Sequence, residues 1–177
     1  KEDIVEKTRI FVEEECKKPK NWWGYEFYSL HLVSVHKYAS LLAKKLNADS
    51  EVVELAAWFH DIGSVIKGRK DHHITGAEIA EQKLGEWKYP EDKIQKVKHC
   101  ILAHRGSLNI KPETIESQII RDADSLSTFD HISGPFLAAF VFEKMNQIEG
   151  RKSVLQKYHN SWNKLSFDES KKLIQPK

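Results

Sequence analysis

The spacing of apolar residues limits the fold of this chain more than any other feature of the sequence. Apolar side chains recur at steps of three and four residues along nearly the whole chain, for example at Ile4, Phe11, Val12 and Cys16. Such spacing gathers them on one face of an α-helix, whereas a half-buried strand needs strict alternation of apolar and polar residues. Convincing alternation is absent from the sequence. We therefore predict an all-α protein without a sheet.

Proline, glycine and capping residues predict where the helices begin and end. Pro90, Pro112 and Pro135 fit the first turn of a helix, where proline is favoured, and Gly150 fits a helix end. Ser166 fits the start of a capping box that opens a short final helix. The predicted helices cover residues 4–16, 29–46, 50–60, 72–84, 90–105, 112–128, 135–150 and a segment after 166. The expected architecture is a single-domain bundle of about eight helices with short loops, apart from two longer ones at Pro19–Phe27 and Gly63–Lys70.

Length and charge narrow the class of protein. The 177 residues suit one domain with its own core, so we assign 1–177 to a single domain. A net charge of +2 gives no strong field toward nucleic acid or a membrane. Cys16 and Cys100 are too few for a disulfide framework, which indicates a reducing compartment. The apolar run 136–142 is far shorter than the roughly 20 residues of a membrane span, and the first residues do not resemble a signal peptide. We expect a cytoplasmic protein.

Histidine is the unusual residue type, with nine in the chain. The dipeptide His60-Asp61 ends a predicted helix, where the backbone can turn so that both side chains reach one divalent ion. By itself such a pair is more often a surface histidine followed by a capping aspartate. A rotation of about 100° per residue places His31 on the buried stripe of its helix and His36 on the polar side. The same rotation directs His60 and His104 toward the core.

Three core-facing histidines on three helices favour a shared polar site, because burying each one without a partner would be costly. Further along the chain, Asp122 and Asp124 lie within an apolar helical pattern. They either form a salt-bridged face with Arg121 or supply a carboxylate ligand. Periodicity does not choose between the two acids.

The order and surroundings of these residues carry a family resemblance. His31, His60-Asp61 and Asp124 resemble the H…HD…D signature of the HD superfamily of phosphohydrolases. Four segments are similar to the surroundings of that signature: Leu55–Gly63, which ends in HDIG, His72–Ala80, Ile101–Arg105 and Asp122–Leu126. The resemblance implies an HD-type helical bundle with a metal-site core over residues 28–130. Residues 131–177 would then form a C-terminal helical extension packed on that core.

The resemblance also implies how a metal would be held. The expected ligands of a divalent ion are His31, His60, Asp61 and Asp124. Asp61 would in addition hold or deprotonate the attacking water. His72 and His104 would bind phosphate, support the ligands or complete a second metal site. The identity of the metal stays open among manganese, nickel, iron, cobalt, magnesium and zinc, as does a count of one or two ions.

Some positions differ from one branch of the superfamily. Ser64 stands where the cyclic-dinucleotide branch of the superfamily often has lysine, and Ala103-His104 keeps one of that branch's two paired histidines. Both departures argue against a cyclic-di-GMP phosphodiesterase. The family spacing favours His72 as the site histidine, whereas helical periodicity favours His73. We adopt His72 and expect the other histidine to face solvent from the first helical turn.

Other residues near the motifs have two interpretations each. The candidates for binding phosphate are Lys67, Arg69, Lys70 and Arg105, and plain surface charge is the alternative. Three aromatic residues precede the first ligand helix, and they either pack in the core or line a pocket and stack on a base. These are Trp22, Trp23 and Tyr25.

The predicted function is metal-dependent hydrolysis of a phosphate ester or anhydride in a small substrate, a nucleotide or a phosphorylated metabolite. One alternative is a nucleoside triphosphate pyrophosphohydrolase. A second, of another class, is a non-catalytic ligand-sensing domain with a structural metal. A nucleic-acid-binding module is disfavoured because the charge is near neutral and no basic stripe is present. The sequence leaves the oligomeric state open, a homodimer included.

Overall fold

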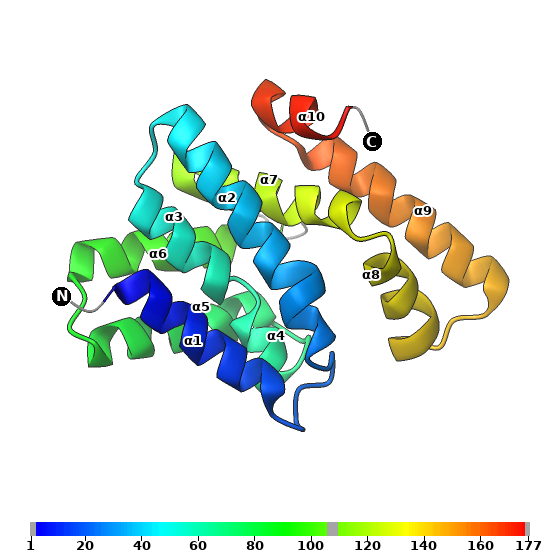
Figure 1. The fold of residues 1–177 in the computed structure, drawn as a ribbon, viewed down its shortest axis with the longest axis horizontal. Coiled ribbons are helices and arrows are strands. Elements are labelled where there is room, and N and C mark those ends of the chain that lie inside the picture. The colour runs from blue at the N-terminus through cyan, green and yellow to red at the C-terminus, as the bar shows by residue number, and fades with distance from the viewer. Residues whose placement is uncertain (1–2, 106–109, 176–177) are drawn as a thin grey trace.

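The computed structural model describes residues 3–105 and 110–175, and over these ranges the protein is helical without strands. Figure 1 shows the arrangement. The elements are α1 (Ile4–Lys17), η1 (Tyr28–Leu32), α2 (Val33–Leu46), α3 (Ser50–Phe59), α4 (Ile62–Lys67), α5 (His72–Glu86), α6 (Glu91–Ala103), α7 (Ile115–Asp130), α8 (Ser133–Phe136), η2 (Leu137–Phe142), α9 (Gln147–Lys164) and α10 (Asp168–Ile174). The predicted all-α fold is confirmed.

Helix α3 lies at the centre of the core and contacts α1, α2, α6 and α7. Its sequence explains this position, because apolar residues cover every side of it from Val52 to Phe59. A helix that is hydrophobic all round is stable only when other elements enclose it. Asp49 begins the helix by accepting a hydrogen bond from the Val52 amide. The end of α3 at Phe59 therefore delivers the following two residues into the interior.

Helices α4 and α5 meet at a glycine. A Cβ atom added at Gly63 would lie 2.2 Å from the His72 carbonyl oxygen and 2.6 Å from the Gly76 amide nitrogen. Only a residue without a side chain permits this approach of the two backbones. Gly63 thus holds the first turn of α5 against the segment that follows α3.

The segment that follows α7, residues 131–175, packs on α7 from the side opposite α6 in Figure 1. Helix α9 contacts α7, α8 and η2, and α10 contacts α7. The buried carboxylate of Asp122 accepts hydrogen bonds from the backbone amides of Ser166 and Phe167. These bonds fasten the α9–α10 junction to α7.

Several predicted boundaries were wrong. Pro112 does not open a helix, because α7 begins at Ile115 with Thr114 as its cap. The segment predicted as one helix from Pro135 to Gly150 is divided into α8 and the π-helical η2, and Gly150 lies in the first turn of α9. Helix α9 was not predicted as a separate element, since its sequence is largely polar.

Two shorter elements also differ from the prediction. Ser166 does not cap α10, because Phe167 occupies the cap position and no side chain bonds there. The residues Ile62–Lys67 form α4, although Gly63–Lys70 was predicted as a loop. No helix in the described part of the chain combines the length and the hydropathy needed to cross a membrane.

Candidate metal centre and its pocket

His60 and Asp61 occupy the turn between α3 and α4. The backbone leaves helical geometry at Asp61, with φ −111° and ψ 11°, so that two adjacent side chains enter the same space. His60 is fully buried, and its Nδ1 lies 2.8 Å from the Ala57 carbonyl oxygen. A carbonyl oxygen only accepts, so Nδ1 carries the proton. The unprotonated Nε2 of His60 therefore faces Asp61, 3.5 Å from Oδ2.

His31 reaches the same place from η1, a π-helical turn that precedes α2. The i→i+5 bond of this turn, from the Val33 amide to the Tyr28 carbonyl, breaks the 100° rotation on which the sequence prediction relied. The Nδ1 atom of His31 lies 3.1 Å from the Ser127 hydroxyl, which donates its own proton to the Asp124 carbonyl at 2.7 Å. The hydroxyl therefore accepts from His31.

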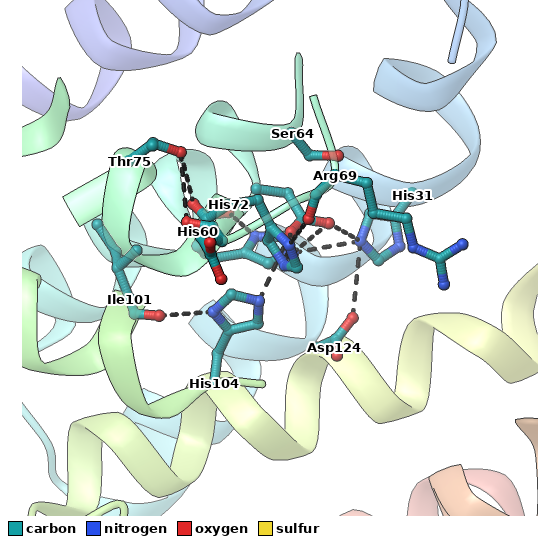
Figure 2. A network of polar contacts seen from close by, with 12 residues as sticks. His31, His60, Ser64, Arg69, His72, Thr75, Ile101, His104 and Asp124 are labelled. Atoms are coloured by element: carbon teal, nitrogen blue, oxygen red, sulfur yellow. Dashed lines mark hydrogen bonds and ion pairs between the residues drawn. The ribbon is translucent and has the colours of Figure 1, made fainter. Parts of the chain in front are cut away.

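Two more imidazoles approach Asp61 from the other side. The Nδ1 atom of His72 lies 2.9 Å from the Arg69 carbonyl oxygen, and that of His104 lies 2.6 Å from the Ile101 carbonyl oxygen. Their Nε2 atoms lie 3.2 Å and 3.5 Å from Asp61 Oδ1. Figure 2 shows these rings and Asp124 pointing toward one another from different helices.

This arrangement fits a metal ion. All four imidazoles place Nδ1 against a protein acceptor, which is the orientation that frees Nε2 for a metal. His31 Nε2 and His60 Nε2 lie 3.2 Å apart, although neither then carries a proton to share. A cation between them removes this conflict. Metal–nitrogen bonds of about 2.1 Å separate neighbouring ligand atoms by roughly 3.0–3.4 Å, close to the distances in this cluster.

The ligand atoms form two groups, within each of which all atoms lie within 4.8 Å of one another. His31, His60 and Asp124 make the first group, and Asp61, His72 and His104 make the second. Asp61 joins them, because Oδ2 lies 3.4 Å from His31 Nε2 while Oδ1 faces the second group. The four residues predicted as one ligand set are therefore together, with two further histidines beside them.

Neighbouring charged groups keep both carboxylates ionised despite their burial. Burial alone would raise the pKa of Asp61, but the imidazoles of His60 and His104 hold it well below its usual range. Burial likewise opposes ionisation of Asp124, yet Lys157 and the imidazoles lower its pKa to about 2. Burial lowers the pKa of His60 to about 4, so this ring stays neutral. The cluster thus holds two negative charges and the neutral donor nitrogen of His60, which together attract a divalent cation.

The pKa of His104 shifts in the opposite direction to that of His60. Burial would lower its pKa, but the contact with Asp61 raises it above the usual value for histidine. Asp61 thus favours a positive charge beside it, which either a proton on His104 or a metal ion supplies.

A cavity of about 730 Å³ opens beside the cluster. Donor residues line one side of it. Residues of α8, η2 and α9 line the opposite side, among them Leu137, Phe142 and Val154. Trp23 lies at this cavity, with its Nε1 donating to the Ser64 hydroxyl at 2.7 Å and its ring in contact with Phe142. Of the two interpretations given for the aromatic residues before the first ligand, Trp23 matches the one that lines a pocket.

The cationic candidates divide into two sets. Arg69 and Arg105 line the cavity, and Arg69 pairs with Glu143 of the opposite wall. Lys67 and Lys70 are exposed and are not among the residues that line the cavity. Of the phosphate-binding candidates, only the two arginines are therefore placed to meet a ligand there.

Two histidines differ from expectation. His73, which was expected to face solvent, is buried with 2% of its surface exposed, while His72 is the one that reaches the cluster. His36 does point away from the cluster, but it is half-buried. It stacks on Trp58 with ring centroids 4.5 Å apart and lies 3.1 Å from Glu54 Oε2. Helical periodicity cannot anticipate such pairing, because both partners come from α3.

Sequence reasoning missed three residues. Ser127, which orients His31, lies three positions after Asp124 on the same helix, and this spacing was a usable signal. Lys157 and Lys164 line the cavity from α9. No motif marks these lysines, and α9 itself was not predicted.

Comparison with known protein families matches residues 28–128 to the HD domain. The chain therefore belongs to the HD domain family. The matched range contains every residue of the two donor groups.

Relatives contain this domain within longer chains. A tRNA (cytidine(56)-2'-O)-methyltransferase of Picrophilus torridus is 32% identical over 116 residues, which cover 58% of this chain and 32% of that protein. A Ribonuclease Y of Symbiobacterium thermophilum is 29% identical over 99 residues, covering 55% of this chain and 17% of that protein. The chain thus spans a third or less of the length of these relatives.

Solved structures share the fold over nearly the whole chain. YpgQ of Bacillus subtilis, in complex with ADP, aligns with a TM-score of 0.71 at 19% identity and covers 97% of this chain and 88% of its own. A predicted HD superfamily hydrolase from an uncultured Thermotogales bacterium aligns with a TM-score of 0.59 at 23% identity. The alignment covers 89% of this chain and 87% of that one. At these identities the likeness concerns the fold.

Proposed function

We propose that this protein is a metal-dependent phosphohydrolase that cleaves a phosphate ester or anhydride in a small substrate. Membership of the HD domain family supports this class of activity in general. One observation carries the proposal: four imidazole Nε2 atoms and two ionised carboxylates converge beside a cavity, and each imidazole has its Nδ1 held by a protein acceptor. A preorganised set of donors without a cation would leave its lone pairs and charges facing one another.

The proposed ligands of the first ion are His31, His60, Asp124 and Asp61 Oδ2. A second ion would be held by His72, His104 and Asp61 Oδ1. When bound, such an ion lowers the pKa of a coordinated water toward about 7 and screens the phosphoryl charge. Nitrogen-rich donor sets favour manganese, iron, cobalt, nickel or zinc over magnesium, which prefers oxygen ligands.

The protein's own residues would position the reactants. Asp61 remains ionised and lies between the two donor groups, so it can hold a water molecule and accept its proton. Arg105 lies beside His104 in the cavity wall, where its guanidinium can bind phosphoryl oxygens. Ser127 fixes the ring of His31 in the orientation that the ion requires.

The cavity supports a small substrate of nucleotide size. Its volume of about 730 Å³ falls within the range of small-molecule pockets. Trp23, Phe27 and Phe142 form an aromatic group at one side, which can pack against a base. The complex of YpgQ with ADP, a protein of the same fold, also supports a nucleotide.

The test is a substrate panel. Chelator-treated protein is assayed against nucleoside mono-, di- and triphosphates, a phosphomonoester and an RNA oligonucleotide, with each of the six metals added separately. We expect phosphate or pyrophosphate release only when a divalent ion is present. His60→Ala should abolish it, whereas His159→Ala, which alters an exposed histidine on α9, should not. Analysis of the released product separates a phosphatase from a pyrophosphohydrolase.

Two outcomes would contradict the proposal. Full activity in metal-free protein would remove the role of the ion. Metal binding that depends on His60, with no hydrolysis of any substrate in the panel, would favour the alternative of a ligand-sensing domain with a structural metal.

A further inference from the structure

Two lysines of α9 line the same cavity as the donor groups. Lys157 and Lys164 are seven residues apart, so they lie on one face of the helix, about 10 Å apart along its axis. Both act on Asp124 electrostatically: Lys157 lowers the pKa of this carboxyl, and Asp124 in turn favours the charged form of Lys164. The lysines therefore belong to the wall of the cavity that adjoins the first donor group.

Neither lysine has an ion-pair partner within 4.0 Å or a hydrogen bond among the residues that the structure describes. Lys164 is half-buried, and burial lowers its pKa. A partly desolvated ammonium without a partner costs free energy. The last turn of a helix favours a positive charge, which explains a lysine at position 164 but not its orientation into a cavity.

Their surroundings add positive charge rather than compensate for it. Arg121 lies near enough to lower the pKa of Lys164, and its own guanidinium is bonded to the neutral hydroxyl of Ser166. Asp124 is the nearby negative group, but a metal ion at the first donor group would neutralise it. With the ion bound, the two lysines of this wall carry charges without an ion-pair partner among the described side chains.

We propose that Lys157 and Lys164 bind a second phosphate group of the substrate, one that the donor groups do not hold. The inference rests on the proposed function for the position of the first phosphate. It narrows the substrate class to molecules that carry a di- or triphosphate, or two separate phosphates, in preference to simple monoesters. Lysine ammonium groups suit this role because they bind phosphate oxygens as charges without a fixed geometry.

The test measures binding and does not depend on turnover. Full-length protein loaded with the divalent ion is titrated calorimetrically with inorganic tripolyphosphate and, separately, with orthophosphate, in buffer that contains the ion in excess and at a temperature at which the sample releases no phosphate. The variant Lys157→Met/Lys164→Met should bind tripolyphosphate about tenfold more weakly or worse, while orthophosphate affinity changes less than about twofold. Lys157→Arg/Lys164→Arg should keep most of the affinity. The matched control is Arg151→Met/Lys152→Met, which removes two exposed charges from the same helix.

The control separates a local subsite from a general effect of net charge. Equal weakening in both double variants, or unchanged tripolyphosphate binding in Lys157→Met/Lys164→Met, would overturn the inference. Circular dichroism and the melting temperature show that each variant is folded. If the wild-type protein hydrolyses no substrate but its tripolyphosphate binding requires the lysines, the proposed function fails and the subsite stands. If the wild-type protein hydrolyses monoesters with metal and replacing the lysines leaves tripolyphosphate binding unchanged, the proposed function stands and the phosphate subsite is wrong.

Discussion

His31 and His36 are only five residues apart, but they have different roles. His31 lies in the donor cluster with Nε2 facing His60 and Asp61. His36 is held between Trp58 and Glu54, away from the cavity. The first histidine is oriented for a ligand, while the second contributes to packing between α2 and α3.

Replacing each histidine by alanine should therefore have different effects. His31→Ala should lose bound metal and nearly all turnover, because one donor is missing. His36→Ala should keep the metal but lower the free energy of unfolding by about 1 kcal/mol, since a half-buried hydrogen bond and a ring contact are lost. Metal analysis, turnover and urea denaturation measure these effects. Loss of metal in His36→Ala with retention in His31→Ala would contradict the assignment.

Gly63 gives a second prediction about a single residue. An alanine Cβ would lie 2.2 Å from the His72 carbonyl oxygen, so α5 must move and take the His72 ring away from Asp61. We expect Gly63→Ala to cost about 2–3 kcal/mol of stability and to weaken metal binding. Gly85→Ala is the control, because its Cβ would meet nothing within 4 Å near the end of α5. It should be neutral or stabilise by about 0.4–1 kcal/mol. Similar losses in both variants would show that the contact at Gly63 is unimportant.

Among the elements, α7 connects the metal centre to the segment that follows it, residues 131–175. Asp122 and Asp124 are two residues apart, which on a helix is a rotation of about 200°. Their side chains therefore face nearly opposite sides of α7. Asp124 faces the donor cluster, and Asp122 holds the amides of Ser166 and Phe167. The two acids that the sequence could not distinguish thus have separate partners.

Alanine at each acid should separate these roles. Asp124→Ala should remove bound metal and turnover. Asp122→Ala removes the buried carboxylate that accepts from the Ser166 and Phe167 amides, so it should cost about 2–3 kcal/mol in stability while the metal stays bound. Metal content and denaturation midpoints check both. The reverse pattern would mean that the ligand belongs to Asp122.

The sequence predicted the elements that periodicity marks strongly and missed those that it does not. Helix α3 is apolar throughout, and its position and its end at His60-Asp61 follow from that pattern. The π-turn η1 and the division of 133–142 into α8 and η2 depend on tertiary packing, which a fixed rotation per residue ignores. Helix α9 is polar and has no clear apolar stripe. Its cap at Asn146 was therefore missed, and Gly150 was interpreted as the end of the preceding helix. The cavity wall that α9 supplies was unpredictable for the same reason.

For the molecule as a whole, the donor groups tie five parts of the chain together: η1, the α3–α4 turn, the start of α5, the end of α6 and α7. An ion bound there stabilises the folded state by mass action, by about 4 kcal/mol at a thousandfold excess over its dissociation constant. We expect the melting temperature of chelator-treated protein to rise by several degrees with added manganese, in proportion to the logarithm of its concentration. His60→Ala should remove this response. An equal rise in His60→Ala would place the stabilising ion elsewhere.

The cavity joins two stretches of sequence that are otherwise separate. Residues 28–128 contain all the donors, whereas the facing wall comes from 131–164. Because few positions contribute to both, the segment 131–164 can change in sequence without displacing the donor residues. Grafting the corresponding segment of another protein with this fold would then alter which molecules fit, while the groups that perform the reaction keep their places.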